Sequence, residues 1–123
     1  MKVWLIHTMA PFYGTDQYYK AYAEEEDTLA NWLWENWYDQ ECQNLWNDFS
    51  FYRDDEYKYE WEDMSDEDKE EFYGNDHDAF MDVKYQEWCE DCSMDVSETT
   101  EYETSLYVPG GEGELEIIYD ERN

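Results

Sequence analysis

The sequence is poor in positive charge. Its 123 residues include 7 Lys and Arg against 35 Asp and Glu, which gives a formal net charge of −28 at pH 7. A chain with so few cations cannot build the basic patch through which proteins attract nucleic acid or an anionic membrane. We therefore expect no direct nucleic acid binding and no membrane binding.

Long apolar runs are also missing. The apolar run nearest the N-terminus covers residues 3–6, which is shorter than the roughly 7–15 residues of a signal-peptide core. No stretch approaches the roughly 20 apolar residues of a membrane span. The three cysteines are an odd number without a secretory context, and this favours reduced thiols. The sequence thus predicts a cytoplasmic protein.

Aromatic residues, in contrast, are abundant. The 7 Trp, 13 Tyr and 5 Phe make up 20% of the chain, whereas acidic disordered segments contain few aromatics. Each aromatic side chain can bury roughly 150–250 Å², so we expect a folded chain with an aromatic-rich interior. The length fits a single acidic domain spanning residues 1–123.

In the first half of the chain, residue patterns predict two strands, one helix and a further strand. Residues 2–8 and 17–24 are rich in β-branched and aromatic side chains and read as strands. Apolar residues recur at helical spacing over residues 29–50. Residues 56–62 alternate aromatic and charged side chains, the pattern of a half-buried strand.

The second half predicts two helices and a hairpin. Ser65 and Gly74 are placed to begin and end one helix, and residues 78–92 form a second amphipathic stretch. Residues 102–108 and 114–120 read as strands around a Gly-rich turn. The predicted fold is α+β, a small antiparallel sheet with two main helices packed on one face.

A Cys-x-x-Cys pair occurs in the segment Trp88-Cys89-Glu90-Asp91-Cys92. It is similar to the Trp-Cys-x-x-Cys motif of thioredoxin-like oxidoreductases, in which the first cysteine begins a helix whose dipole lowers the thiol pKa. Here both cysteines lie towards the end of a predicted helix, and two acids between them disfavour a thiolate. We interpret the pair as small apolar residues on the inner face of that helix.

The same cysteines raise the question of a zinc site. Together with Cys42 and either His7 or His77 they would supply four ligands, but a lone Cys-x-x-Cys pair is a weak signal. Whether Cys42, Cys89 and Cys92 bind a metal stays open at this stage. Acid pairs such as Asp66 and Asp68 begin like a calcium loop but lack its later Gly and Glu, so no dedicated metal site is predicted.

The sequence holds no motif of a known catalytic site. A P-loop, a nucleophile elbow and a Gly-x-Gly-x-x-Gly turn are all absent, and carboxylate pairs are too numerous to mark an active site. We expect no enzymatic activity and no cofactor.

Acidic residues are densest in the middle of the chain. Residues 54–91 contain seventeen acids against three lysines, a local charge of −14 and half of the total. Acids three or four residues apart on a helix lie about 5–6 Å from one another, close to the spacing of successive phosphates. Asp66 with Glu70 and Asp78 with Asp82 have this spacing.

In size, charge and aromatic content the chain resembles the phage DNA-mimic inhibitors, namely anti-restriction proteins of the Ocr type and acidic anti-CRISPR proteins. The resemblance implies a viral inhibitor that occupies the positively charged nucleic-acid-binding channel of a bacterial defence complex. Its partner would be a basic nucleic-acid-binding protein or ribonucleoprotein, either a CRISPR effector or a restriction enzyme. If a phage encodes the chain, its location would be the host bacterial cytoplasm.

The predicted contact surface consists of fourteen acids in this middle segment. Their charge would steer them to a basic groove and displace its counterions. They are Asp54, Asp55, Glu56, Glu60, Glu62, Asp63, Asp66, Glu67, Asp68, Glu70, Glu71, Asp76, Asp78 and Asp82.

Three other interpretations remain open. An immunity or inhibitor protein could bind a basic toxin or nuclease by charge without imitating a duplex. An acidic chaperone would bind many basic proteins, and a halophile's domain would carry acids for salt adaptation. The partner's identity and the oligomeric state, a homodimer included, are not fixed by the sequence.

Overall fold

The computed structural model describes residues 1–12 and 14–122 and confirms an α+β fold. Its elements, in chain order, are β1 (Lys2–Met9), β2 (Gln17–Ala23), α1 (Glu26–Asn36), α2 (Tyr38–Asp48), α3 (Ser50–Asp63), α4 (Asp66–Tyr73), α5 (His77–Asp91), β3 (Ser93–Thr99), α6 (Glu101–Ser105), the short 3₁₀ helix η1 (Pro109–Gly111) and β4 (Ile117–Asp120).

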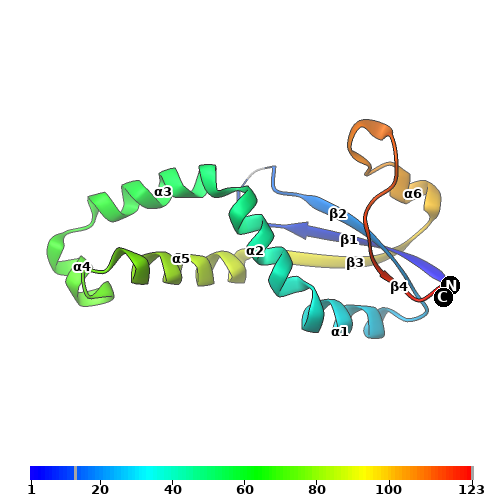
Figure 1. The fold of residues 1–123 in the computed structure, drawn as a ribbon, viewed down its shortest axis with the longest axis horizontal. Coiled ribbons are helices and arrows are strands. Elements are labelled where there is room, and N and C mark those ends of the chain that lie inside the picture. The colour runs from blue at the N-terminus through cyan, green and yellow to red at the C-terminus, as the bar shows by residue number, and fades with distance from the viewer. Residues whose placement is uncertain (13, 123) are drawn as a thin grey trace.

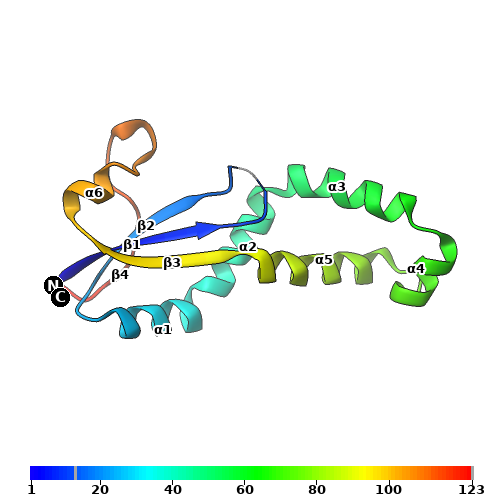
Figure 2. The same ribbon diagram turned by 180° about the vertical axis from the view of Figure 1, so that it is seen from behind.

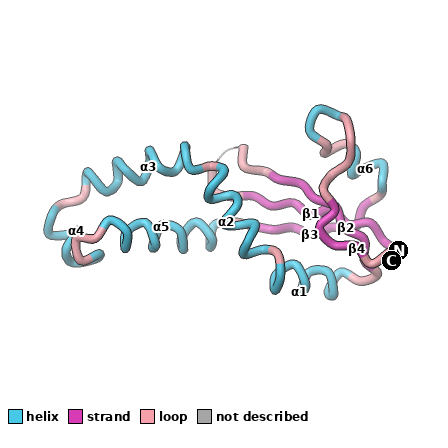
Figure 3. Tube along the Cα trace, in the orientation of Figure 1, coloured by secondary structure: helices cyan, strands magenta, loops and turns pink. Residues whose placement is uncertain are grey.

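The sheet has the order β3-β1-β2-β4 (Figures 1 and 3). β1 is antiparallel to both β2 and β3, whereas β4 runs parallel to β2. The prediction of a wholly antiparallel sheet with a C-terminal hairpin is therefore wrong. β4 pairs with the far edge of the sheet, because the segment after β3 turns through α6 and η1 before the chain returns along β2.

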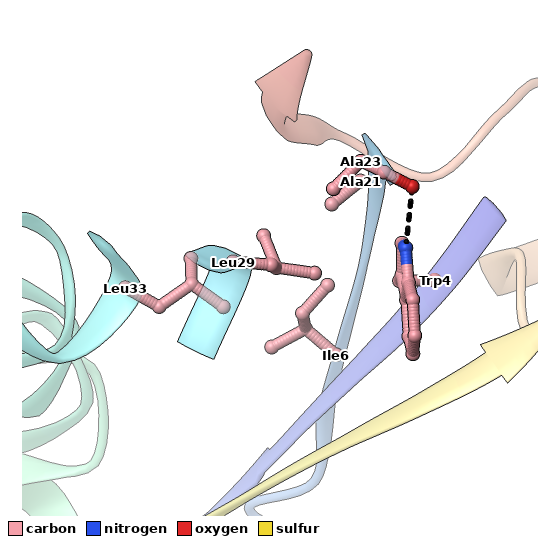
Figure 4. Packing of buried hydrophobic residues seen from close by; sticks show 6 residues of the cluster. All are labelled: Trp4, Ile6, Ala21, Ala23, Leu29 and Leu33. Atoms are coloured by element: carbon pink, nitrogen blue, oxygen red, sulfur yellow. Dashed lines mark hydrogen bonds between the residues drawn. The ribbon is translucent and has the colours of Figure 1, made fainter. Parts of the chain in front are cut away.

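The central core lies between one face of the sheet and α1 (Figure 4). Small side chains on β2 leave room for the helix, and the indole Nε1 of Trp4 donates a hydrogen bond of 3.0 Å to the Ala23 carbonyl oxygen. The buried members are Trp4, Ile6, Ala21, Ala23, Leu29 and Leu33. Aliphatic side chains thus fill much of this centre, and aromatics surround it.

A second core joins the end of β1 to α2 and α5. Ala10, Leu45 and Trp88 are buried there, with Trp46 and Phe49 packed beside them. The rings of Trp46 and Trp88 meet edge to face at 5.6 Å, an arrangement that adds to the stability from buried area. The aromatic-rich interior expected from composition is most evident at this junction.

The predicted helix over residues 29–50 is interrupted. α1 ends at Asn36, the backbone of the next residue, Trp37 (φ −126°, ψ −41°), is not helical, and α2 begins directly after it. The Trp37 ring packs edge-on against Tyr19 of β2 at 5.0 Å. The helical spacing of apolar residues continues across this break, and the sequence alone therefore predicts one helix.

The strand predicted over residues 56–62 is wrong, because this segment belongs to α3. Tyr57 and Trp61 are four residues apart and both lie half-buried on one side of the helix, whereas Tyr59 is exposed. A helix satisfies its own backbone hydrogen bonds, and none of the strands among residues 1–12 and 14–122 pairs with this segment. Alternation of aromatic and charged side chains over seven residues could not distinguish a half-buried strand from this helix.

The next two helices were predicted correctly. The Ser65 hydroxyl caps α4 by accepting a hydrogen bond of 3.1 Å from the Asp68 backbone N–H. Gly74 ends α4 in the left-handed conformation, with φ of 62°, which glycine adopts without steric cost. α5 covers nearly all of the predicted segment 78–92.

Residues 102–108 form a helix and turns instead of the predicted strand. Thr100 caps α6 by accepting from the Glu103 backbone N–H at 3.2 Å. The Thr-x-x-Glu spacing is a capping signature that the strand prediction overlooked. β3, at the other edge of the sheet, was not predicted at all, and the predicted strand over 114–120 shortens to β4.

The helices do not both pack on one face of the sheet, as the sequence had suggested. α1 lies against the sheet, whereas α3 and α5 run side by side away from its end, with α4 at their tip (Figures 1 and 2). Within the described part of the chain, none of the helices combines the length and the apolar character needed to cross a lipid bilayer.

Candidate interaction surface

The helices α3, α4 and α5, residues 50–91, form a projection that we call the acidic arm (Figure 2). It carries seventeen of the 35 acidic residues and four of the seven Lys and Arg. Its formal charge is therefore −13, close to half the total. The structure brings the charge-dense middle of the sequence into one extended unit.

All fourteen predicted contact acids lie on or between the helices of this arm, and all are exposed. Six of them, from Asp54 to Asp63, belong to α3, five, from Asp66 to Glu71, belong to α4, and Asp78 and Asp82 belong to α5. Asp76 also has a structural role, because its carboxylate accepts a hydrogen bond from the Asp78 backbone N–H at 3.0 Å and so begins α5.

The arm's cations neutralise few of these acids. Among the described residues, Asp54 and Glu60 are the members of the fourteen that form ion pairs, with Arg53 at 2.6 Å and Lys84 at 2.6 Å. Lys69 lies over the ring of Trp61, 5.1 Å from its centre. The remaining carboxylates therefore present their charge to solvent.

Aromatic packing holds the tip of the arm together. The Trp61 ring of α3 contacts Phe80 and His77 of α5, with ring centres 5.1 and 5.4 Å apart. Tyr73 of α4 packs edge-on against Phe80 at 5.2 Å. Phe80 is fully buried although it lies far from the sheet. This packing lets the helices lie together while their outer faces carry like charges.

Arg53, at the base of the arm, combines two contacts. Its guanidinium carbon lies 3.5 Å from the centre of the Trp46 ring, and its Nη1 pairs with the Asp54 carboxylate. Its Nε also donates to the Trp46 carbonyl oxygen at 2.9 Å. Burial lowers the pKa of Arg53, partly offset by Asp54.

Large aromatic side chains are exposed between the acids, and for one of them, Tyr59, the sequence predicts the wrong orientation. Phe51 is 74% exposed and Phe72 is 66% exposed, and Tyr52 and Tyr59 are also open to solvent. The alternation in residues 56–62 had suggested that Tyr59 points inward with its neighbours. The helical period of α3 was the signal that would have placed it outside.

Two ionisable clusters outside the arm serve the fold. Lys20 is buried and donates to the exposed Glu101 at 2.5 Å, as does the Tyr22 hydroxyl at 2.5 Å. These hydrogen bonds lower the pKa of Glu101. Glu41 is buried and accepts from the Tyr19 hydroxyl at 2.9 Å, and burial raises its pKa.

Cys42 and Cys89 line one cavity at the base of the arm, and Cys92 directly follows α5, but neither histidine joins them. His7 pairs with Asp16 at 2.7 Å, and His77 lies at the tip against Trp61. The four-ligand zinc site considered from the sequence therefore does not form from these residues. Over residues 1–12 and 14–122, no group of three or more His, Cys, Asp or Glu is arranged to hold a metal ion.

Comparison with known proteins gives no relatives: no family model, no curated protein and no solved structure matches the chain.

Proposed function

We propose that the protein is a DNA-mimic inhibitor whose acidic arm occupies the positively charged nucleic-acid-binding channel of a bacterial defence complex, a CRISPR effector or a restriction enzyme. The observation that carries this proposal is the arm itself, which exposes all fourteen predicted contact acids and, within the described part of the chain, pairs only two of them with cations. Binding there would exclude the target DNA by competition.

The charge of the arm is similar to that of a short duplex. α3 has 14 residues and spans about 21 Å at a rise of 1.5 Å per residue. Duplex DNA carries one charge per about 1.7 Å, so about 12 charges over the same length. The arm carries a formal charge of −13. A groove built to hold phosphates would therefore meet a comparable charge.

Exposed aromatics would add contacts that phosphates cannot make. An arginine guanidinium can stack on an aromatic ring while it pairs with a carboxylate. Arg53 makes this double contact within the protein, with Trp46 and Asp54. Phe51 and Tyr59 lie among acids on the outer side of α3, and they offer the same combination to the arginines of a partner.

A matched pair of variants tests the proposal. The arm variant changes Asp55, Glu62, Asp63, Glu71 and Asp82 to their amides, and all five are exposed. The control variant makes the same number of changes outside the arm, at exposed acids of the sheet side: Glu24, Glu35, Asp95, Glu98 and Glu112. Both variants have the same net charge, so a difference between them depends on position.

The two variants and the parent chain are immobilised and incubated with bacterial lysate at low and at high salt. We expect the parent and the control variant to retain a nucleic-acid-binding protein at low salt that added duplex DNA releases. The arm variant should lose at least tenfold in affinity for that protein, since each lost ionic contact weakens a counterion-release interaction.

Other outcomes would overturn the proposal. A retained protein that duplex DNA does not release would favour an inhibitor of a toxin or nuclease that binds elsewhere. Equal retention of many basic proteins by all three chains would favour an acidic chaperone. Equal losses in the two variants would mean that net charge, and not the arm, determines binding.

A further inference from the structure

Three thiols lie together where the acidic arm joins the rest of the fold. Cys42 is on α2, Cys89 is in the last turn of α5, and Cys92 follows the end of α5. Cys42 is only 2% exposed, whereas the other two are half-buried. All three are free cysteines. Cys42 and Cys89 line one cavity, and Cys89 and Cys92 both pack against the core around Leu45 and Trp88.

Cys42 is the most deeply buried thiol of this cluster. Tyr38, one helical turn earlier on α2, lines the same cavity. The hydrogen bond from Cys92, followed by those from Tyr38 and Cys89, lowers the pKa of Cys42 to about 7, although burial and the nearby Asp39 act in the opposite direction. A thiolate is the nucleophilic form of cysteine.

The pKa values of the other two thiols are raised. The pKa of Cys92 is raised well above its usual range, chiefly by its hydrogen bond to Cys42, with burial and the adjacent Asp91 adding to the effect. Burial raises the pKa of Cys89, although a hydrogen bond from Tyr85 opposes this. Cys42 is therefore the thiol of this cluster that ionises most readily.

A cavity of about 470 Å³ gives access to the cluster. Cys42 and Cys89 line it, together with the aromatic side chains of Trp34 and Tyr85, and its acidic neighbours are Asp39 of α2 and Glu90 of α5. Each water occupies about 30 Å³ in the liquid, so a molecule as small as hydrogen peroxide fits this space. The acids around the cavity disfavour anionic reagents, whereas a neutral peroxide is not repelled.

The position of the thiols in the chain gives a bond between them a structural consequence. Cys42 precedes the arm and Cys92 follows it, so a Cys42–Cys92 disulfide would join both ends of residues 50–91. Closing a long loop restricts the unfolded chain and stabilises the folded state. A bond between Cys89 and Cys42 would enclose almost the same segment.

We propose that Cys42 is a site of oxidation by small neutral peroxides and that Cys92 then forms a disulfide with it. The Cys42 thiolate attacks one peroxide oxygen, the O–O bond breaks, and hydroxide leaves, so that the sulfur becomes a sulfenic acid. The Cys92 thiol, after losing its proton, attacks that sulfur and displaces the hydroxyl group, which leaves as water. The net change converts two thiols and one peroxide to one disulfide and two waters.

The experiment treats the reduced full-length chain with hydrogen peroxide and maps the products by mass spectrometry. We expect a loss of two hydrogens and a cross-linked peptide pair containing Cys42 and Cys92. The Cys89→Ser variant should form the same bond. In Cys92→Ser together with Cys89→Ser, a sulfenic acid should instead accumulate on Cys42 and react with dimedone. Circular dichroism checks that each variant is folded.

A second measurement does not depend on peptide mapping. Oxidation of the Cys89→Ser variant should raise its midpoint of thermal unfolding, and dithiothreitol should reverse the rise. A disulfide between Cys89 and Cys92 with Cys42 left as a thiol would overturn the proposal. So would a folded chain in which all three thiols survive peroxide at a concentration that oxidises free cysteine. Because both measurements use the chain alone, neither depends on the proposed inhibitory function.

Discussion

Lys84 of α5 donates a hydrogen bond of 2.6 Å to the Glu60 carboxylate of α3 and so links the two long helices of the acidic arm. Its side chain is mostly buried, and its Nζ also lies 5.3 Å from the centre of the Phe80 ring. Burial by itself would lower the pKa of Lys84, but the hydrogen bonds to Glu60 and Glu87 and the charges of these two carboxylates together outweigh this and raise it. One cation is thus placed between helices that otherwise repel each other.

Replacing Lys84 with methionine should lower the free energy of unfolding by about 1–2 kcal/mol, because a charge-assisted hydrogen bond is lost and Glu60 is left without its cation. Lys58→Met is the matched control, since Lys58 is exposed and forms no ion pair among the described residues. The control should change stability by less than about 0.5 kcal/mol. Urea unfolding at constant salt measures both. Equal losses would mean that only the net charge matters.

Whereas replacing Lys84 should destabilise the protein, replacing Glu41 should stabilise it. Burial raises the pKa of Glu41, so the folded state binds the proton more tightly than the unfolded state does. Ionising the buried Glu41 carboxyl group therefore lowers the stability of the folded state. This loss of stability is absent below the unfolded pKa of about 4.5 and fully present above the folded pKa. Glu41→Gln keeps an oxygen that accepts from Tyr19 but carries no charge. It should therefore stabilise the protein by about 1 kcal/mol at neutral pH.

The pH dependence distinguishes this account from a simple packing effect. The gain from Glu41→Gln should disappear near pH 4, where the carboxyl group of the parent chain is protonated in both states. Glu35→Gln, at an exposed position of α1, serves as the control and should be neutral across this range. A gain that persists unchanged at pH 4 would rule out the ionisation penalty as its cause.

Local signals predicted the parts of the fold that depend on local chemistry. Ser65 and Gly74 fixed α4 because a cap and a left-handed residue act within one turn. The strand pairing of β4 could not be predicted this way, since it depends on contacts between distant segments. β3 was missed because its exposed positions are polar and only Met94 and Val96 pack towards the core.

The candidate surface was predictable in its charges but not in its shape. A segment rich in acids can be recognised from its composition, and all fourteen predicted residues are exposed in the structure. The aromatic exposure of Tyr59 depended on α3 being a helix. The meeting of Cys42 with Cys92 depended on how α2 packs against the end of α5, which no local pattern encodes.

Salt should stabilise the protein. Like charges on the arm repel each other over distances that are screened when the Debye length falls from about 30 Å at 0.01 M to about 8 Å at 0.15 M salt. We expect the midpoint of thermal unfolding to rise by several degrees over this range of sodium chloride. The five-residue arm variant should unfold at a higher temperature in dilute buffer and respond less to salt. If the midpoint of thermal unfolding of the parent chain does not change with salt, the charges of the arm do not act together.

The exposed aromatics of α3 should contribute to binding and not to folding. Phe51 and Tyr59 are 74% and 64% exposed, so the double variant Phe51→Ser, Tyr59→Ser should change stability by less than about 0.5 kcal/mol. Fluorescent deca-arginine and deca-lysine are suitable probes, because both pair with carboxylates but arginine stacks better on rings. The parent chain should prefer deca-arginine by roughly two- to fivefold for each ring that stacks, given about 0.5–1 kcal/mol per exposed stacking contact. The double variant should bind deca-arginine more weakly, so that its preference for deca-arginine over deca-lysine approaches that of a surface that binds by charge alone. Its binding to deca-lysine should stay unchanged. An unaltered preference would assign arginine recognition to the carboxylates alone.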